Sequence, residues 1–313
     1  MTRQIRRVAV IGTGVIGASW TALFLDRGID VAATDVAPGA EGRLNEFLHL
    51  ALAQLDELGV KREKLGNLTF HADVVQAVKG VDLVQENGPE RIDFKRQLYA
   101  QLDELLDEDV IIASSSSGLT MSEIQVACAR HPERCVIGHP FNPPHLIPLV
   151  EIVGGAKTSE AAMVRLEEFY TDLGKRTIRL NKEVPGHVAN RLQAALWREV
   201  VHLVSDGVVS VADADTAVCW GPGLRWGVMG PTLLFHLGGG PGGIEHFFDQ
   251  FTGPMTAWWG VLGNPKITPE VRHIIVDGVL KQVGGRSIEE LAAHRDEMLM
   301  GLLDVRDSHE GAA

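Results

Sequence analysis

The opening of this 313-residue chain constrains its fold more than any other part. An unbroken apolar run over residues 8–11 is followed by the pattern G-x-G-x-x-G at Gly12, Gly14 and Gly17. A strand that is buried on both faces of a parallel sheet has such a continuous run, whereas a half-exposed strand alternates. An amphipathic run follows the glycines, and a second apolar run ends at Asp35. This order predicts strand, tight turn, helix and strand, which is the first unit of a doubly wound α/β sheet.

The three glycines and Asp35 together indicate a dinucleotide site. The first glycine makes the turn, the second lets backbone N–H groups approach a pyrophosphate, and the third lets the helix pack on the strand. Asp35 lies where a carboxylate accepts the ribose hydroxyls, and residues 36–38 lack the positive charge that a 2′-phosphate needs. An ordinary strand-to-helix turn is the alternative interpretation. We expect NAD, rather than NADP, to be bound by Gly12, Thr13, Gly14, Val15, Ile16, Gly17 and Asp35.

The composition is that of an ordinary soluble globular protein, with 45% hydrophobic and 22% charged residues. A formal net charge of −12 argues against a nucleic-acid or anionic-membrane partner. No apolar run is long enough to span a membrane, and the first strand begins too early for a signal peptide. The three cysteines have no CxxC spacing, which predicts neither a disulfide framework nor a metal site. We therefore expect a cytoplasmic protein that binds no membrane, nucleic acid or metal.

Strand-like and helical patterns alternate up to a proline and a glycine at residues 185 and 186, and the remaining chain has helical patterns. We therefore predict two domains. Residues 1–184 form an NAD-binding domain of the Rossmann type, and residues 185–313 form a helical domain.

Two polar groups follow apolar strands in the first domain. Four serines, Ser114 to Ser117, follow the strand at residues 110–113, and His139 ends the strand that follows. Ligands bind beyond the carboxyl ends of strands in open α/β sheets, so both groups are candidates for the site. Glu151 stands within a third apolar run, where a carboxylate needs a partner. A His–Glu pair would make His139 a base for a hydroxyl proton. The alternatives are a polar turn, a structural histidine and an edge-strand glutamate.

Five motifs occur in a defined order: the glycine-rich opening, the serine cluster, HPFNP from His139, LVE ending at Glu151, and PGHVANRL over residues 185–192. In this combination the chain resembles the L-3-hydroxyacyl-CoA dehydrogenase superfamily over nearly its whole length. The resemblance implies a Rossmann-type NAD domain followed by an all-helical domain, which makes most of the contact in a homodimer. It also implies that a 3-hydroxyl group is oxidised with NAD as acceptor.

The resemblance also assigns residues to roles. The histidine of H-x-x-N-P and the glutamate of L-V-E, the family's catalytic pair, fall on His139 and Glu151. The family's serine falls on Ser117, with Ser116 as the alternative, and its asparagine in N-R-L falls on Asn190.

Three further positions concern the cofactor. The family's cofactor-contacting glutamate and lysine best match Glu90 and Lys95. The asparagine of the family's S-N-T-S motif is replaced by Ser115 in this chain.

Within this superfamily the chain is most similar to the L-carnitine 3-dehydrogenases and, more distantly, to the L-gulonate 3-dehydrogenases. This similarity rests on residues 196–199, 220–231 and 286–291. A trimethylammonium head cannot donate a hydrogen bond and is held by aromatic faces, whereas a carboxylate suits an arginine fork. We expect Phe141, Trp197, Trp226 and Phe235 to hold the ammonium group and Arg225 to hold the carboxylate. Burial in a core or a dimer interface is the alternative for each tryptophan.

Three functions remain open on these grounds. The first is oxidation of L-carnitine to 3-dehydrocarnitine. The second is the same reaction on a short-chain 3-hydroxyacyl-CoA or on L-gulonate. The third is a non-enzymatic NAD-binding protein, which would not need both His139 and Glu151.

Overall fold

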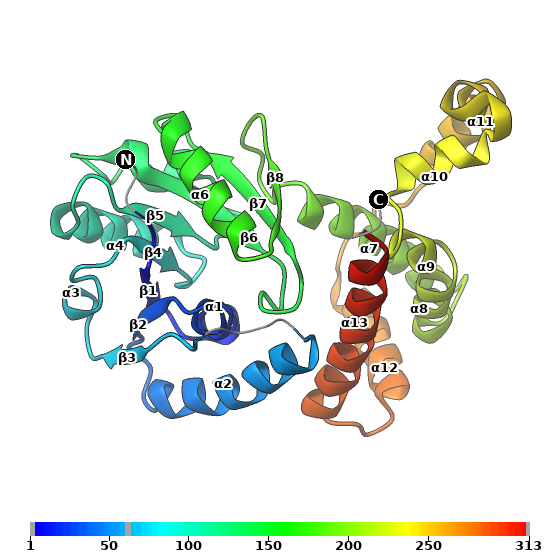
Figure 1. Cartoon of the computed structure of the whole chain (residues 1–313). Coiled ribbons are helices and arrows are strands. Elements are labelled where there is room, and N and C mark those ends of the chain that lie inside the picture. The colour runs from blue at the N-terminus through cyan, green and yellow to red at the C-terminus, as the bar shows by residue number, and fades with distance from the viewer. Residues whose placement is uncertain (1–3, 60–63, 311–313) are drawn as a thin grey trace. The chain divides into compact units, whose positions relative to one another are not determined.

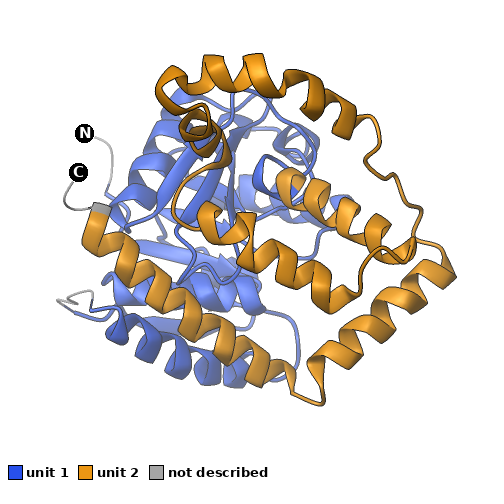
Figure 2. Ribbon diagram, turned by 90° about the vertical axis from the view of Figure 1, so that its right-hand side faces the viewer, with its two compact units in different colours: residues 1–190 blue, residues 191–313 orange. Residues whose placement is uncertain are grey.

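The computed structural model describes residues 4–59 and 64–310. The chain divides into two compact units, residues 1–190 and 191–313, which Figure 2 shows in different colours. The first unit is built around a sheet, and the regular structure described in the second unit is helical (Figure 1). This architecture confirms the predicted fold class.

The sheet of the first unit has eight strands in the order β3-β2-β1-β4-β5-β6-β7-β8. Neighbouring strands are parallel except β6 and β7, which are antiparallel. The first six strands have the order of a Rossmann fold. The strands are β1 (Arg7–Ile11), β2 (Asp30–Thr34), β3 (Leu68–His71), β4 (Leu83–Glu86), β5 (Ile111–Ser114), β6 (Cys135–Pro140), β7 (Leu149–Gly154) and β8 (Arg176–Arg179).

Helices cover both faces of this sheet. Side chains of α1, α2 and α6 belong to the core on one face, and side chains of α4 and α5 belong to the core on the other. Val8 and Val10 of β1 enter the first core, while Ala9 and Ile11 enter the second, which explains the unbroken apolar run. The helices are α1 (Val15–Asp26), α2 (Ala40–Glu57), α3 (Val74–Ala77), α4 (Ile92–Leu105), α5 (Met121–Gln125), the 3-10 turn η1 (Pro132–Arg134) and α6 (Glu160–Asp172).

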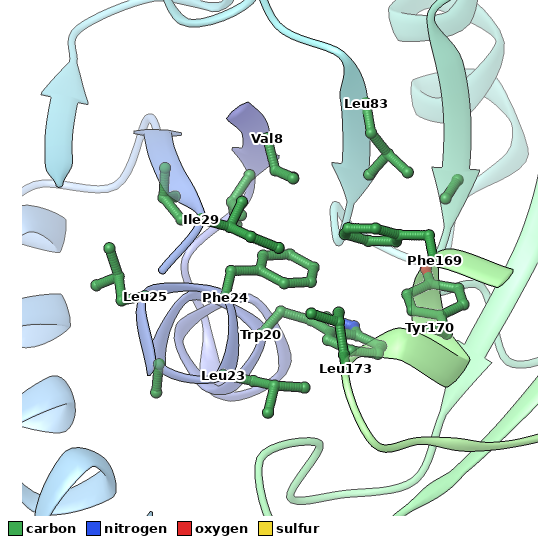
Figure 3. Packing of buried hydrophobic residues seen from close by; sticks show 14 of the residues in the cluster. Val8, Trp20, Leu23, Phe24, Leu25, Ile29, Leu83, Phe169, Tyr170 and Leu173 are labelled. Atoms are coloured by element: carbon green, nitrogen blue, oxygen red, sulfur yellow. The ribbon is translucent and has the colours of Figure 1, made fainter. Parts of the chain in front are cut away.

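Stacked aromatic rings form the centre of the first core (Figure 3). The Trp20 ring lies 5.3 Å from the Phe24 ring and 5.2 Å from the Tyr170 ring, and all three side chains are fully buried. Aromatic pairs in this geometry stabilise a core beyond the area they bury. These contacts join α1 to α6 and so fix the helix whose first turn follows the glycine loop.

The second unit has a small core of its own. Val204, Val211 and Ala214 are buried together, with Ile275 packed against them. In the described part of the chain, no helix is both long and apolar enough to cross a bilayer. The helices are α7 (Ala189–Ser205), α8 (Val211–Trp220), α9 (Pro222–Trp226), α10 (Pro231–Gly238), the 3-10 turn η2 (Gly240–Gly242), α11 (Gly243–Trp259), α12 (Pro269–Val283) and α13 (Ile288–Glu310).

Candidate active site

The catalytic and cofactor candidates of the first unit lie at one edge of the sheet. The glycine loop follows β1, Glu90 follows β4, the serine cluster follows β5, and His139 stands near the end of β6. These four strands are parallel, so their carboxyl ends lie at the same edge. Ligands bind at this edge in doubly wound sheets.

His139 and Glu151 form a buried hydrogen-bonded pair. The two residues are direct partners in the antiparallel ladder of β6 and β7, so their side chains lie on the same face. His139 Nδ1 lies 2.8 Å from Glu151 Oε2, and both side chains are buried. An ionised carboxylate only accepts hydrogen bonds, so Nδ1 carries the hydrogen and Nε2 keeps a free lone pair. The imidazole is therefore oriented as a base.

Two backbone amides hold the other oxygen of Glu151. The N–H groups of Val188 and Ala189 donate to Oε1 at 2.9 and 3.0 Å, at the N-terminus of α7. Burial alone would raise the pKa of Glu151, but the bonds from His139 and these amides outweigh it and hold the pKa below its ordinary value. The carboxylate therefore stays ionised and can stabilise a protonated His139.

Each serine of the cluster has a different partner. Ser114 Oγ donates to Glu86 at 2.6 Å, Ser115 Oγ to Asn87 at 2.7 Å, and Ser116 Oγ to Glu90 at 2.7 Å. Ser117 alone is turned toward the base, with its Oγ 3.1 Å from His139 Nε2.

Asn190 completes the group around the lone pair of His139. Its Nδ2 lies 3.5 Å from His139 Nε2 and 3.4 Å from the carbonyl oxygen of Ser117. The hydroxyl of Ser117, the amide of Asn190 and the imidazole therefore converge on one point. Polar groups in this arrangement can orient a hydroxyl oxygen while the imidazole takes its proton.

The glycine loop has the geometry that a pyrophosphate needs. Gly12 has φ of 83°, and a Cβ on Gly17 would lie 1.8 Å from the carbonyl oxygen of Gly12. A Cβ on Gly14 would meet no atom within 4 Å, and Gly14 and Val15 are exposed at the start of α1. The loop thus leaves an open helix N-terminus, a feature that favours phosphate binding.

Asp35 lies beside this loop. Its Oδ2 accepts hydrogen bonds from the N–H of Thr13 at 2.7 Å and from the Thr13 hydroxyl at 3.2 Å, and Oδ1 accepts from Ala37 N–H at 2.8 Å. A carboxylate oxygen has about two acceptor sites, so Oδ1, which accepts one bond from Ala37, can also accept a ribose hydroxyl. These residues fit NAD.

Glu90 and Lys95 lie close together. Oε1 of Glu90 accepts hydrogen bonds from the N–H groups of Gly118 and Leu119 at 2.7 and 3.1 Å, as well as from Ser116, and so holds the serine cluster in place. Lys95 is buried, and its ammonium donates to both carboxylate oxygens of Glu86 at 2.9 Å. Contact of either residue with the cofactor stays a prediction.

The predicted substrate residues belong to both units. The Phe141 ring lies 5.6 Å from the His139 ring, edge to face, in the first unit. Within the second unit, the Trp197 side chain is exposed on α7, and Phe235 stacks on Phe247 at 4.7 Å. Arg225 and Trp226 lie on α9. The binding roles of these residues stay predictions.

The sequence did not single out two features of this site. His187 is buried with its ring 5.0 Å from the His139 ring, and it lies within the PGHVANRL motif without having been assigned a role. Ser115 also accepts hydrogen bonds from Gln85 at 2.9 Å and Trp20 at 3.2 Å, so it belongs to a buried polar network. The position of His187 depends on its backbone φ of 50°, which the spacing of residues in the sequence does not encode.

Comparisons with known proteins identify the family of this chain. The NAD-binding domain of 3-hydroxyacyl-CoA dehydrogenase matches residues 7–184, and the C-terminal domain of the same family matches residues 186–263. The L-carnitine dehydrogenase of Streptomyces coelicolor is 46% identical over 301 residues, which cover 96% of this chain and 94% of the relative. The L-carnitine dehydrogenase of Pseudomonas putida is 42% identical over 310 residues, which cover 99% and 96%.

A solved structure agrees over both units. The chain is 32% identical to 5-formyl-3-hydroxy-2-methylpyridine 4-carboxylic acid 5-dehydrogenase, an NAD⁺-dependent dismutase, with a TM-score of 0.85. The match covers 97% of this chain and 99% of that one. This chain belongs to the 3-hydroxyacyl-CoA dehydrogenase family and carries that family's NAD-binding domain in its first unit.

Proposed function

We propose that this protein oxidises the 3-hydroxyl group of L-carnitine to give 3-dehydrocarnitine, with NAD as the acceptor. The observation that carries the proposal is the His139–Glu151 pair, whose free Nε2 faces Ser117 and Asn190. A protein that only bound NAD would have no need of an oriented base at this sheet edge. The similarity to L-carnitine dehydrogenases over nearly the whole chain supports the substrate.

The residues act in the following way. Ser117 and Asn190 hold the substrate hydroxyl against His139, whose Nε2 takes the hydroxyl proton as the C–H bond breaks. Bound NAD would supply the acceptor for the hydride that leaves this carbon as the C–OH group becomes C=O. Glu151 stabilises the imidazolium that His139 becomes. The Gly12–Gly17 loop and Asp35 hold the cofactor at the same edge.

The substrate head groups would be held by the aromatic and cationic residues predicted from the sequence. Phe141 supports this assignment because its ring adjoins the base. Trp197, Trp226 and Phe235 would provide further faces for the trimethylammonium group, at about 0.5–2 kcal/mol per contact. Arg225 would bind the carboxylate. The net charge of −12 suits a substrate with a cationic head.

We also propose that the protein is a cytoplasmic homodimer that associates through its helical C-terminal domain, residues 185–313. Large apolar side chains support this proposal because several are exposed on the second unit. Trp220, Trp258 and Trp259 are 78%, 58% and 67% exposed in the single chain. Exposed apolar surface of this kind is usually covered by a partner.

A substrate panel tests the function. Formation of NADH is followed at 340 nm with L-carnitine, L-gulonate and 3-hydroxybutyryl-CoA, and with D-carnitine as the stereochemical control. We expect kcat/KM to be highest for L-carnitine, and rates with D-carnitine to be near background. A good rate on either competitor with no rate on L-carnitine would overturn the substrate assignment and leave the reaction type standing.

A further inference from the structure

His187 is buried next to the catalytic groups, although the mechanism above gives it no part. Its side chain is 1% exposed, and its ring centroid lies 5.0 Å from that of His139. Its Nε2 lies 2.9 Å from the carbonyl oxygen of Ser116. A buried imidazole this close to the base either assists the chemistry or holds its surroundings in place.

The hydrogen-bond partners of His187 define its protonation state. A carbonyl oxygen only accepts, so Nε2 must carry the hydrogen. Nδ1 is buried and has no hydrogen-bond partner among the residues that the structure describes. A cationic ring would leave a buried N–H without an acceptor at Nδ1. Burial, together with the nearby His139, lowers the pKa of His187 against the opposing effect of the bond to Ser116. His187 is thus a neutral imidazole with its hydrogen on Nε2.

The bond from His187 acts on the peptide that precedes Ser117. The Ser116 carbonyl and the Ser117 N–H belong to one planar unit, so fixing the carbonyl also fixes where the Ser117 side chain begins. The Ser117 hydroxyl is the group that lies 3.1 Å from His139 Nε2. The hydroxyl of Ser116 donates a second hydrogen bond, to Glu90. Ser116 is therefore held at its carbonyl by His187 and at its side chain by Glu90.

The backbone at His187 links this anchor to Glu151. His187 has φ of 50°, a left-handed conformation that residues other than glycine seldom adopt. The turn lets its side chain meet Ser116, while the next two amides, of Val188 and Ala189, bind Glu151 at 2.9 and 3.0 Å. Strained conformations of this kind persist where surrounding contacts hold them, often at functional sites.

We propose that His187 is a positioning residue for the dehydrogenase reaction: its Nε2–H anchors the Ser116 carbonyl so that the Ser117 hydroxyl stays in place against the His139 base. His187 exchanges no proton with the substrate. It contributes by keeping the substrate-orienting hydroxyl of Ser117 in place.

A double-mutant cycle tests this role. His187→Phe keeps an aromatic ring but removes the donor, and we expect kcat/KM to fall about 10- to 100-fold, as misplaced substrate-orienting groups typically cause. In a Ser117→Ala background the same change should cost less than about threefold, because two residues that act through one contact are not additive. His187→Gln places an amide N–H near the position of Nε2 and should restore activity to within about threefold of the parent.

A second buried histidine provides the matched control. His145 bonds to Ser19 at 2.7 Å and to Gln54 at 2.8 Å, on α1 and α2. His145→Phe can affect activity only by disturbing the fold. We therefore expect it to lower kcat/KM by the same factor in the parent protein and in the Ser117→Ala background. NAD affinity should be unchanged in all His187 variants. Additive effects of His187→Phe and Ser117→Ala, or a failure of His187→Gln to restore activity in a protein that binds NAD normally, would overturn the proposal.

A measurement on the unsubstituted protein keeps the proposal testable even where His187→Phe does not fold. Histidine ¹⁵N shifts, assigned to His187 by loss of the signal in His187→Gln, report which ring nitrogen carries the hydrogen. We expect the neutral form with the hydrogen on Nε2 at pH 7.5. The opposite tautomer or a cation would refute the anchor. This readout needs no substrate, whereas the activity readouts rest on the proposed function and use whichever substrate the panel selects.

Discussion

At the scale of single residues, the direct pairing of His139 with Glu151 across two antiparallel strands decides what chemistry the site can do. The carboxylate fixes which ring nitrogen is free, and that nitrogen faces the Ser117 hydroxyl at 3.1 Å. Neither the serine nor the asparagine at this point can accept a proton as readily as a neutral imidazole. This geometry supports the proposal that His139 is the base and that Ser117 and Asn190 orient its substrate.

Glu151→Gln should remove this orientation without removing bulk. The amide can donate to His139 Nδ1, which favours the tautomer with its hydrogen on Nε2 and no base lone pair toward the substrate. We expect kcat to fall about 100-fold or more, by analogy with the loss of an orienting carboxylate in other histidine-dependent enzymes. Steady-state kinetics check the loss, and the Kd for NAD serves as the control. Turnover within a few-fold of the parent would show that Glu151 does not set the tautomer.

Residue types could be predicted from the sequence better than residue contacts. The family pattern selects Ser117 from four adjacent serines by register, and each hydroxyl has a separate partner in the structure. The place of His187 could not be predicted, because it depends on a left-handed backbone at one residue. Glu90 likewise accepts hydrogen bonds from the backbone amides of Gly118 and Leu119, just after the serine cluster, and backbone amides leave no trace in the side-chain pattern.

At the scale of elements, the glycine loop and the first helix pack closely against each other. Gly17 packs so closely on Gly12 that no side chain fits between them. Trp20 anchors the same helix by stacking on Phe24 and Tyr170 (Figure 3). These contacts hold α1 and its open first turn against the rest of the first unit.

Gly17→Ala should disturb both the packing and the cofactor site. Its Cβ would lie 1.8 Å from the Gly12 carbonyl oxygen, so the loop must move away from the helix. We expect about 1–3 kcal/mol less free energy of unfolding, measured with urea, as overpacking typically costs. We also expect at least tenfold weaker NAD binding, measured by fluorescence titration.

Gly14→Ala is the matched control for this prediction. Its Cβ would meet nothing within 4 Å of the protein, and its φ of −63° suits alanine. The free energy of unfolding should change by less than about 0.5 kcal/mol, as for other substitutions that disturb no packing. Binding of NAD should still weaken, because the methyl group stands where the pyrophosphate approaches. Equal destabilisation by both substitutions would contradict the close packing of Gly17.

Local elements were predictable because their signals lie within a few residues. The continuous apolar run of β1, the glycine turn and α1 each depend on short-range patterns, and they form as expected. The ladder of β6 and β7 depends on pairing between separate segments. Periodicity predicts each strand but not its partner or its register. For this reason the sequence alone left contact between His139 and Glu151 open.

At the scale of the whole molecule, the two units differ in the size of their buried cores. The first unit contains two large cores, one on each face of its sheet. The second has a small core and carries exposed tryptophans. Residues 185–190 pack with the first unit, because Val188, Ala189 and Asn190 bind Glu151, His139 and Ser117. The predicted boundary at residues 184 and 185 stays a prediction.

The exposed tryptophans lead to a prediction about assembly. Covering large apolar side chains on association gives a favourable free energy of about 25 cal/mol per Å² of apolar surface removed from water. We expect a molar mass twice that of the chain in size-exclusion chromatography with light scattering at micromolar concentration. Purified residues 1–184, used for comparison, should be monomeric if that fragment folds. A full-length chain that elutes with the mass of a monomer would contradict the homodimer.

The central claim is that one imidazole, that of His139, takes the substrate proton. The most direct test measures NADH formation by His139→Gln at saturating NAD and substrate, on the substrate that the parent protein oxidises fastest. Loss of a general base typically costs about 10²–10⁴ in rate, so we expect turnover to fall by that factor. The Kd for NAD should stay within about twofold of the parent value, since the substitution leaves the glycine loop untouched. Turnover within a few-fold of the parent, with normal NAD affinity, would contradict the claim.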